Sequence, residues 1–197
     1  MKDLIYLTTD PYKGKNLNEI FMRNYGFNIE IVNPGFEILE IQAKTSSEVA
    51  AFSAKSAANK LNSAVIKSSI GLYIDALGGL PGPYNQYFYS QLGEDKFLEL
   101  LKGETNRKAE LEYCLAYCEP GSEPIVFVDR SIGEIAPKSK GKVGKWYDLF
   151  YIPEGETKTL SQLKKTNYDK DNSYEGDSIE RFAKWYIEKN KDELKQL

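Results

Sequence analysis

Apolar and polar residues alternate along the chain with two spacings, one typical of strands and the other of helices. Short apolar runs predict strands at 4–7, 27–32, 64–74, 111–117, 124–128 and 147–152. Helical spacing places Leu17, Ile20 and Phe21 on one face of a first helix. Three more helices are expected, from Ser46 to about Leu61, over 96–102, and over about 178–194. Strands and helices therefore mix along the chain, which predicts an α/β fold.

Turn-forming residues separate these elements. The turn at 119–122 joins two apolar runs and predicts a hairpin, and the segment 138–145 is a loop rich in glycine and lysine. The segment 77–84 contains three glycines and two prolines, which implies a tight, fixed backbone. The polar stretch 164–176 is expected to be a mobile loop.

Composition limits the class of protein. A chain of 197 residues with 41% hydrophobic and 28% charged residues suits one globular domain, 1–197. No apolar run approaches the roughly 20 residues that span a bilayer, and the N-terminus lacks a signal-peptide pattern, so we expect a soluble, cytoplasmic protein without membrane contact. The net charge of −3 argues against broad electrostatic binding to nucleic acid. It does not exclude a local basic pocket for one phosphate-bearing ligand.

The types of residue present exclude several chemistries. The chain has no histidine, which excludes nucleophiles paired with histidine and zinc sites of the cysteine-histidine type. Cys114 and Cys118 are the only cysteines, and strand alternation places both on one face. We expect buried free thiols rather than a disulfide. Catalysis would therefore depend on carboxylates, lysines, hydroxyls or a hard metal ion.

The glycine-rich segment 77–84 follows a predicted strand, which leaves two interpretations open. Exposed N–H groups of such a loop can bind phosphate oxygens. The segment lacks the Gly-Lys-Ser/Thr ending of a Walker loop and the spacing of a dinucleotide fingerprint, so a purely structural turn is the alternative.

The same region resembles a known family. Segment 75–84, Asp-Ala-Leu-Gly-Gly-Leu-Pro-Gly-Pro-Tyr, is similar nearly residue for residue to the segment that marks the Ham1 or inosine triphosphate pyrophosphatase family. The start of the chain resembles the first loop of the family, and Trp-Tyr-Asp at 146–148 with Pro-Glu-Gly at 153–155 resembles another conserved stretch. The similarity extends from about Leu4 to Arg181. It implies an elongated mixed sheet in two lobes with a nucleotide cleft between them, and commonly a homodimer.

The resemblance also implies a reaction. Family members cut a magnesium-bound nucleoside triphosphate between the α- and β-phosphates and prefer inosine and xanthosine bases. Glu40 corresponds to one of the acidic residues that hold the metal. The other two correspond to Ser68 and Ser69, which carry no charge at neutral pH and are poor bases. Glu40 is therefore the single catalytic and metal-binding candidate, with a local turn cap as its alternative role.

Further binding residues are implied by the same resemblance. Tyr147 would stack on the purine and Asp148 would lie near the base, although Tyr147 suits a core position too. Arg181 alone matches the family's Ser-His-Arg motif, since Ile179 and Glu180 occupy the other positions. The remaining substrate-binding candidates are Thr8, Asp10, Lys13, Lys15, Lys55, Gly78 and Gly79. The three lysines also suit a solvated surface.

Two functions follow. The first is binding of ITP, dITP or XTP with little or no hydrolysis, as a sensor or regulatory subunit. Ham1-like subunits of Kongming-type antiphage systems are similar, which implies a Sir2-like NAD-consuming partner. The alternative is an active, magnesium-dependent pyrophosphatase that yields the monophosphate and pyrophosphate, with Glu40, Asp75 or Asp10 holding the metal.

Overall fold

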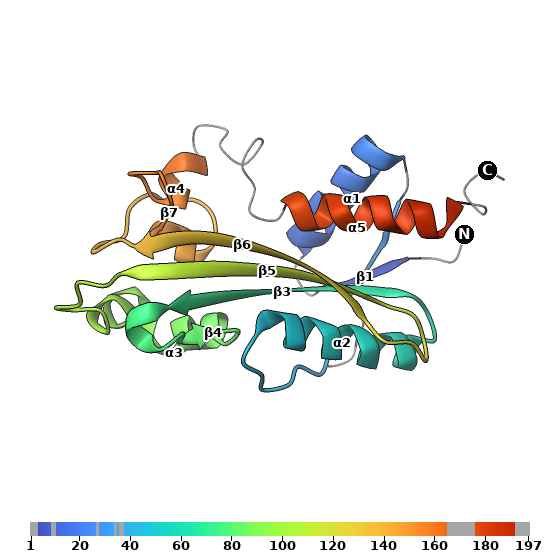
Figure 1. Cartoon of the computed structure of the whole chain (residues 1–197), viewed down its shortest axis with the longest axis horizontal. Helices are drawn as coiled ribbons and strands as arrows, with labels where there is room; N and C mark the ends of the chain where they lie inside the picture. Colours follow the sequence, from blue (N-terminus) through green and yellow to red (C-terminus); the bar gives the residue numbers. More distant parts are fainter. Residues whose placement is uncertain are drawn as a thin grey trace.

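A long, twisted β-sheet runs through the molecule and carries helices on both faces (Figure 1). We describe a computed structural model that covers residues 4–8, 11–26, 28–33, 35, 38–164 and 176–191. The sheet has seven strands, and six of them follow the order β2-β1-β3-β5-β6-β7. Their bounds are β1 Ile5–Leu7, β2 Glu30–Val32, β3 Val65–Ile74, β4 Pro81–Gly82, β5 Lys108–Cys118, β6 Ile125–Ile135 and β7 Tyr151–Pro153.

The sheet is mixed. β1 pairs in parallel with β2 and β3, whereas β3, β5, β6 and β7 form an antiparallel series. β4 pairs antiparallel with β3. The α/β architecture with a mixed sheet therefore confirms the fold class expected from the sequence.

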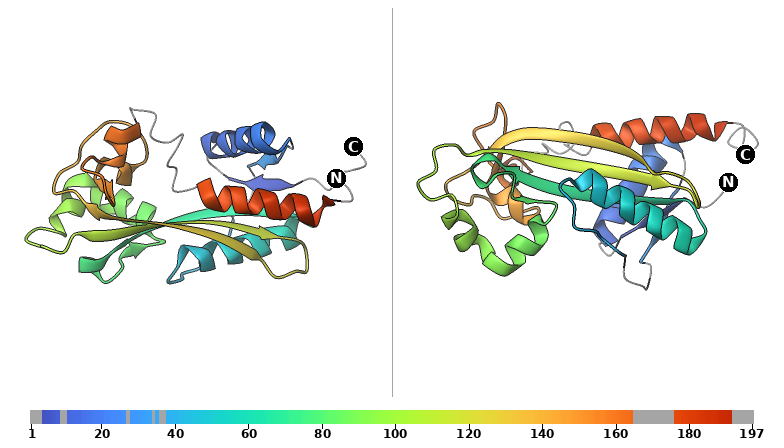
Figure 2. Two further views of the ribbon diagram at one scale, coloured as in Figure 1. Left: turned by 45° about the horizontal axis from the view of Figure 1, so that its top comes forward. Right: turned by 60° about the horizontal axis from the view of Figure 1, so that its bottom comes forward.

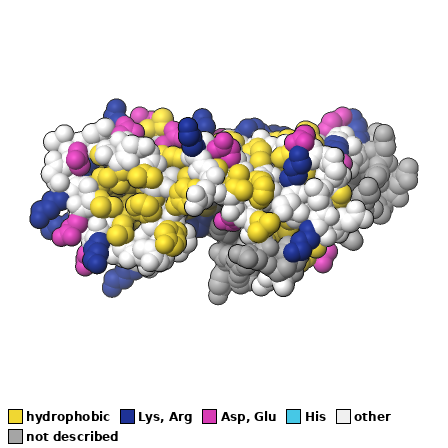
Figure 3. Space-filling view, turned by 90° about the horizontal axis from the view of Figure 1, so that it is seen from below, with side chains coloured by type: hydrophobic (Ala, Val, Ile, Leu, Met, Phe, Trp, Pro, Cys, Tyr) yellow, Lys and Arg dark blue, Asp and Glu magenta, His cyan; other side chains and the backbone are white. Residues whose placement is uncertain are grey.

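Helices are grouped at the two ends of the sheet. Their bounds are α1 Pro11–Tyr25, α2 Ser46–Leu61, α3 Asn85–Glu99, α4 Leu160–Leu163 and α5 Gly176–Lys189, with short 3₁₀ helices η1 Asp75–Leu77 and η2 Trp146–Leu149. At one end, α1 and α5 lie on one face of the sheet and α2 on the other (Figure 1; Figure 2, left). α3, β4, α4 and β7 lie together at the other end. Figure 3 looks onto the face with α2 and α3, where hydrophobic side chains gather. Phe52 of α2 and Tyr87 of α3 are among the exposed hydrophobic residues of the structure.

Two hydrophobic clusters hold these layers together. The larger one joins α1, α5 and both ends of the sheet, and Phe21 of α1 packs edge-on against Phe182 of α5, with ring centroids 5.6 Å apart. The smaller one lies under α2, where alanines allow the helix to approach β3 and β5 closely. Cys114 and Cys118 are buried free thiols in this second cluster, as the alternation predicted.

α2 begins where the sequence predicted, but the cap is one residue earlier. Thr45 is the N-cap, and its side chain accepts a hydrogen bond from the Glu48 N–H while the Glu48 carboxylate accepts from the Thr45 N–H. Gly71 of β3 lies directly below: a Cβ there would be 2.4 Å from Ser46 Oγ. Glycine at this position therefore lets the start of α2 rest on the sheet.

One edge of β3 is shared by two different partners. β1 pairs with β3 at Val65 and Ile66, and β4 pairs with it at Leu72 and Tyr73. Among the described residues, no strand pairs with this edge over 67–71. That central stretch contains both serines of the predicted site, and it lies between the end that carries α1, α2 and α5 and the end that carries α3 and α4.

Three sequence predictions need correction. The predicted strand 147–152 is the 3₁₀ helix η2 followed by the short β7. The predicted helix at 96–102 is only the end of α3, which begins at Asn85 and bends at Gly93, where φ is 70°. The hairpin strands are longer than predicted, because β5 and β6 support each other well beyond their apolar runs. No helix of the described residues is long and apolar enough to cross a membrane.

Candidate functional site

The two serines at the predicted acidic positions point to opposite faces of β3, because successive strand residues alternate. Ser68 Oγ lies 2.7 Å from Tyr6 Oη, on the face covered by α1 and α5. Ser69 shares the other face with Gly71, whose Cα faces Ser46 of α2. At most one of the two serine side chains can therefore face a ligand bound on a given face of β3.

Glu40 and Lys67 meet on the α2 face. Lys67 is two residues before Ser69 on β3, so both side chains lie on this face. The Lys67 ammonium is 3.8 Å from Glu40 Oε1, and the two side chains are 9% and 61% exposed. Burial lowers the pKa of the Lys67 ammonium, and the Glu40 carboxylate partly opposes that shift. The predicted catalytic carboxylate thus faces a buried cation.

The described residues do not form a magnesium site here. Magnesium prefers several oxygen ligands, usually carboxylates together with phosphates and water. No group of three or more acidic, histidine or cysteine side chains is placed to hold a metal ion in the described part of the chain. Ser69 contributes no charge, and the nearest cation to Glu40 is an ammonium group. These donors do not fit a metal held by the protein.

The buried carboxylate of Glu112 is already engaged nearby. Its Oε1 accepts a hydrogen bond from the Ser46 N–H at 3.1 Å, and its Oε2 accepts from Arg130 at 3.0 Å. The Tyr73 hydroxyl joins the same group, and burial raises the pKa of Tyr73 to about 12. Glu112 therefore anchors the N-terminus of α2 rather than adding a free acid to the site.

The amides of Gly78 and Gly79 are used within their own turn. The Gly78 N–H donates to Asp75 O and the Gly79 N–H to Ile74 O, each at 3.0 Å. Both glycines have positive φ, which glycine tolerates. A phosphate cradle requires backbone N–H groups that are free to bind the ligand, whereas these two donate within the turn. The structure therefore supports the interpretation of this loop as a structural turn.

Tyr147 and Asp148 lie in η2, at the end of the molecule that carries α3 and α4. The Tyr147 ring is 2% exposed and packs in the main core, beside Trp146. Asp148 is fully buried, and its Oδ2 accepts from Lys164 Nζ at 2.8 Å and from the Lys145 N–H at 2.6 Å. Asp148 Oδ1 is buried without a hydrogen-bond partner among the described residues. Burial raises the pKa of Asp148, and Lys164 opposes the shift.

Arg181 is in α5 and contacts β6. Its Nη2 atom donates to Val128 O at 2.6 Å and to Asp129 Oδ1 at 2.8 Å. Asp129 also accepts from the Ser178 N–H at 2.6 Å, so it holds the start of α5. In sheet register Asp129 is opposite Tyr113, which is opposite Ile70. Asp129, which Arg181 contacts, is therefore level with the unpaired stretch of β3, two strand spacings or about 10 Å across the sheet.

The other binding candidates are separated. Thr8 is buried directly after β1, and its N–H donates to Val32 O. Asp10 lies outside the described residues, and Lys13 and Lys15 belong to the first turns of α1, where only the backbone is described. Lys55 of α2 forms an ion pair with Glu123 in the β5–β6 turn at 2.5 Å. Lys55 therefore lies on the solvated side of α2.

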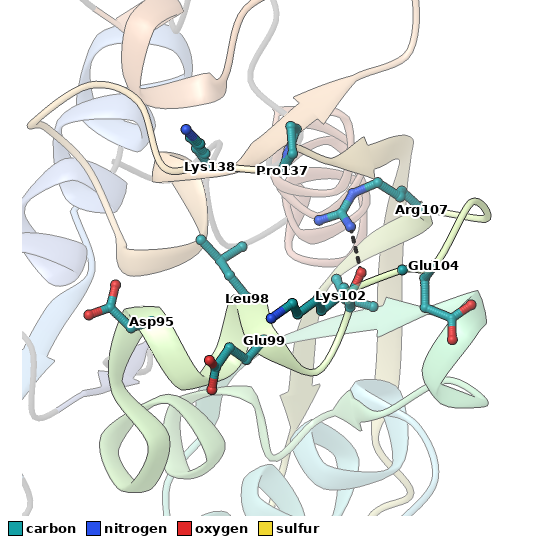
Figure 4. A pocket seen from close by; sticks show the side chains of 10 residues that line it. Asp95, Leu98, Glu99, Lys102, Glu104, Arg107, Pro137 and Lys138 are labelled. Carbon is teal, nitrogen blue, oxygen red and sulfur yellow. Dashed lines mark hydrogen bonds between the residues drawn. The ribbon is translucent and has the colours of Figure 1, made fainter.

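A separate hollow opens beside α3 (Figure 4). It has a volume of about 670 Å³ and is lined by Leu98, Lys102, Arg107 and Lys138 among others. The Arg107 guanidinium donates to three backbone oxygens, those of Leu101, Ile135 and Ala136. The guanidinium therefore links the turn after α3 to the end of β6. None of the predicted site residues lines this hollow.

Two residues of the site were not assigned from the sequence. Lys67 carries a signal in the sequence, because this charged residue directly follows the apolar run 64–66 within the predicted strand 64–74. Lys164 gave no local signal, since its partner Asp148 is 16 residues away and their contact depends on how α4 folds against η2.

Comparison with known proteins places this chain and its fold in a family. The chain matches the Ham1 family over residues 4–185. It belongs to the Ham1 family. Its structure is similar to the Ham1 protein of Staphylococcus aureus, with a TM-score of 0.79, 25% identity, and coverage of 95% of this chain and 100% of that one. A HAM1 protein from Coxiella burnetii shares the fold, with a TM-score of 0.81, 22% identity and the same coverage.

Closer relatives in sequence carry a functional name. A dITP/XTP pyrophosphatase from Methanopyrus kandleri is 38% identical, over 93% of this chain and 95% of the relative. One from Thermococcus kodakarensis is 33% identical, over 94% and 97%. These names favour the enzymatic interpretation of the sequence over binding without hydrolysis.

Proposed function

We propose that this protein binds deaminated purine nucleoside triphosphates, dITP, ITP or XTP, and that it releases pyrophosphate from them. The relatives named dITP/XTP pyrophosphatase align with nearly the whole chain, which supports this class of substrate and reaction. The phosphates would lie along the unpaired edge of β3, near Thr8 and Ser69. The base would approach η2, which carries Tyr147 and Asp148.

The observation that carries the choice of base is the buried Oδ1 of Asp148, which has no hydrogen-bond partner among the described residues. Hypoxanthine and xanthine have an N1–H that can donate to this carboxylate oxygen, whereas N1 of adenine is an acceptor and would be repelled. A buried polar group left unpaired costs about 1 to 3 kcal/mol, so the expected preference is about ten- to a hundredfold. The ion pair with Lys164 helps to keep Asp148 charged and therefore an acceptor.

Binding without turnover is the second candidate. Ser68 and Ser69 stand where the family resemblance implies carboxylates, and no described residue replaces their charge beside Glu40. We propose that any magnesium enters bound to the nucleotide phosphates, since the protein supplies too few ligands. A slow enzyme or a sensor for dITP fits these residues better than a fast enzyme does.

The test is a parallel measurement of binding and hydrolysis. We expect titration calorimetry to show dITP and ITP binding at least about tenfold more tightly than dATP and ATP. Pyrophosphate release from the same samples separates an enzyme from a sensor. Asp148→Asn should reduce the preference, because an amide can also donate to N1 of adenine. Asp95→Asn, an exposed change on α3, serves as the control. Equal affinities for dITP and dATP in the wild type would contradict the proposal.

The assembly is proposed on the family resemblance. We propose that residues 1–197 form one domain and that two copies associate as a homodimer. Hydrophobic side chains gather on the face with α2 and α3 (Figure 3), and such an exposed surface suits a contact of this kind. A Sir2-like NAD-consuming partner remains a further proposal. Light scattering of the purified chain, alone and with a candidate partner, would test both.

A further inference from the structure

The buried face of β3 carries a cation whose donors are almost unused. The Lys67 side chain is 9% exposed, and its one described ion pair, with Glu40, is 3.8 Å long. No hydrogen bond joins its ammonium group to another described residue. A lysine ammonium has three donors, and a buried charge is costly unless it is paired. This arrangement suits a group that receives its main partner from a ligand.

The position of Lys67 suggests the chemistry of that ligand. Lys67 begins the stretch of β3 whose edge is unpaired between β1 and β4, and Ser69 lies two residues further on the same face. The Ser69 hydroxyl has no hydrogen bond to a described residue. An ammonium beside a free hydroxyl offers donors to an anion, and phosphate oxygens accept from both.

The positive charge on this face of β3 disfavours the binding of a metal ion. A divalent cation beside Glu40 would lie within a few ångströms of the Lys67 ammonium and would be repelled by it. Glu40 is also mostly exposed, and so it is free to move away when an anion takes its place beside Lys67.

We propose that the Lys67 ammonium is a built-in counter-charge for the nucleotide phosphates, so that dITP binds to this protein without a divalent cation. The inference rests on the proposed nucleotide binding and deepens it. Lys67 would neutralise the phosphate charge that a metal ion held by the protein would otherwise neutralise. Glu40 forms the ion pair with Lys67 when no nucleotide is bound.

The experiment measures dITP binding to the full chain by calorimetry, with magnesium and with excess EDTA. We expect the two wild-type dissociation constants to agree within about threefold, since the counter-charge belongs to the protein. Lys67→Met should weaken binding in EDTA by about ten- to a hundredfold, the effect of losing a charge-assisted contact. Lys108→Met, the same change at an exposed position of β5, is the matched control.

Glu40→Gln provides a second, independent readout. It removes the resting partner and a charge that competes with the phosphates, so metal-free binding should become several-fold tighter. If Glu40 instead held an essential metal, this variant would lose binding in magnesium, and that result would overturn the proposal. Wild-type binding in magnesium but not in EDTA would overturn it too, while leaving the proposed function intact. No dITP binding under either condition would instead refute the proposed function itself.

Discussion

Single residues in this protein carry charges where little water reaches them. Asp148 is fully buried against Lys164, and Lys67 is nearly buried against a distant Glu40. Such groups destabilise the fold unless their partners are close, and they are often kept for binding. Within the part of the chain that the structure describes, Asp148 has a short ion pair and one oxygen without a hydrogen-bond partner, whereas Lys67 has neither a short ion pair nor a hydrogen bond.

The pH dependence of stability should reveal Asp148. Burial raises its pKa, so the folded state binds this proton more readily than the unfolded chain does. Its stabilising contribution is complete below the ordinary carboxyl pKa, near 4, and is lost as the pH rises through the raised value. We therefore expect the free energy of unfolding of the wild type to fall relative to Asp148→Asn from about pH 4 upward. Urea denaturation at several pH values measures this difference; a relative rise with pH would show that Lys164 outweighs burial.

Lys67→Met should raise stability even as it weakens binding. Removing an incompletely paired buried charge in favour of an apolar side chain commonly stabilises a protein, here by on the order of 1 kcal/mol. Thermal melting without nucleotide should therefore shift upward by about 2 to 4 °C. A large downward shift would indicate that Lys67 is a structural residue rather than a binding residue.

Among the elements, α2 is held against the sheet by a group of polar contacts at its N-terminus. Its first N–H group, that of Ser46, donates to both the Glu112 carboxylate and the Tyr73 hydroxyl, and Arg130 of β6 holds Glu112 from the other side. These contacts join α2 to three strands of the sheet. The Ser53 hydroxyl of α2 also donates to Leu39 O, which holds the segment that carries Glu40 beside the helix.

Gly71→Ala tests the close contact between the N-terminus of α2 and β3. The new methyl group would lie 2.4 Å from Ser46 Oγ and 2.6 Å from the Tyr73 ring, so α2 or Tyr73 must move. Overpacking of this kind costs about 1 to 3 kcal/mol. Adding Ser46→Ala to the variant removes the closest contact and should restore part of the loss in chemical denaturation. If the two changes are simply additive, the clash with Ser46 is not the cause.

At the scale of the whole molecule, the candidate site draws on both ends of the sheet. The residues proposed to face the phosphates lie where β3 passes between β1 and β4, and those proposed to face the base lie in η2 beyond β6. Arg181 lies level with the middle of the sheet, on α5. Nucleotide binding would therefore connect two parts that the long strands β3, β5 and β6 hold in register.

This geometry predicts which serine matters for hydrolysis. Ser69 shares the α2 face with Lys67 and therefore with Glu40, whereas Ser68 contacts Tyr6 on the opposite face. The double variant Lys67→Val with Ser69→Asp should thus gain magnesium-stimulated pyrophosphate release from dITP, and Lys67→Val with Ser68→Asp should gain much less. Equal gains from both pairs would mean that the face of β3 does not decide the activity.

Much of the fold could be predicted from local patterns. The apolar run at 64–74, the alanines of α2 and the hairpin turn at 119–122 each correspond to an element of the structure, because periodicity and turn chemistry are local properties. The placement of both thiols on one face of β5 followed from the same alternation. The start of α3 at Asn85 and the 3₁₀ helix at Trp146 were missed, since their apolar residues do not follow one clear period.

The sequence by itself determined the α/β class, the order of the main elements and the uncharged side chains at Ser68 and Ser69. Tertiary structure alone decided which charges meet: Lys67 with Glu40, Lys164 with Asp148, and Arg181 with Asp129. Each of these pairs joins different elements, and its contact depends on strand register and helix docking. Long-range packing sets both, because the free energy of a charge depends on the neighbours and water around it rather than on its neighbours in sequence.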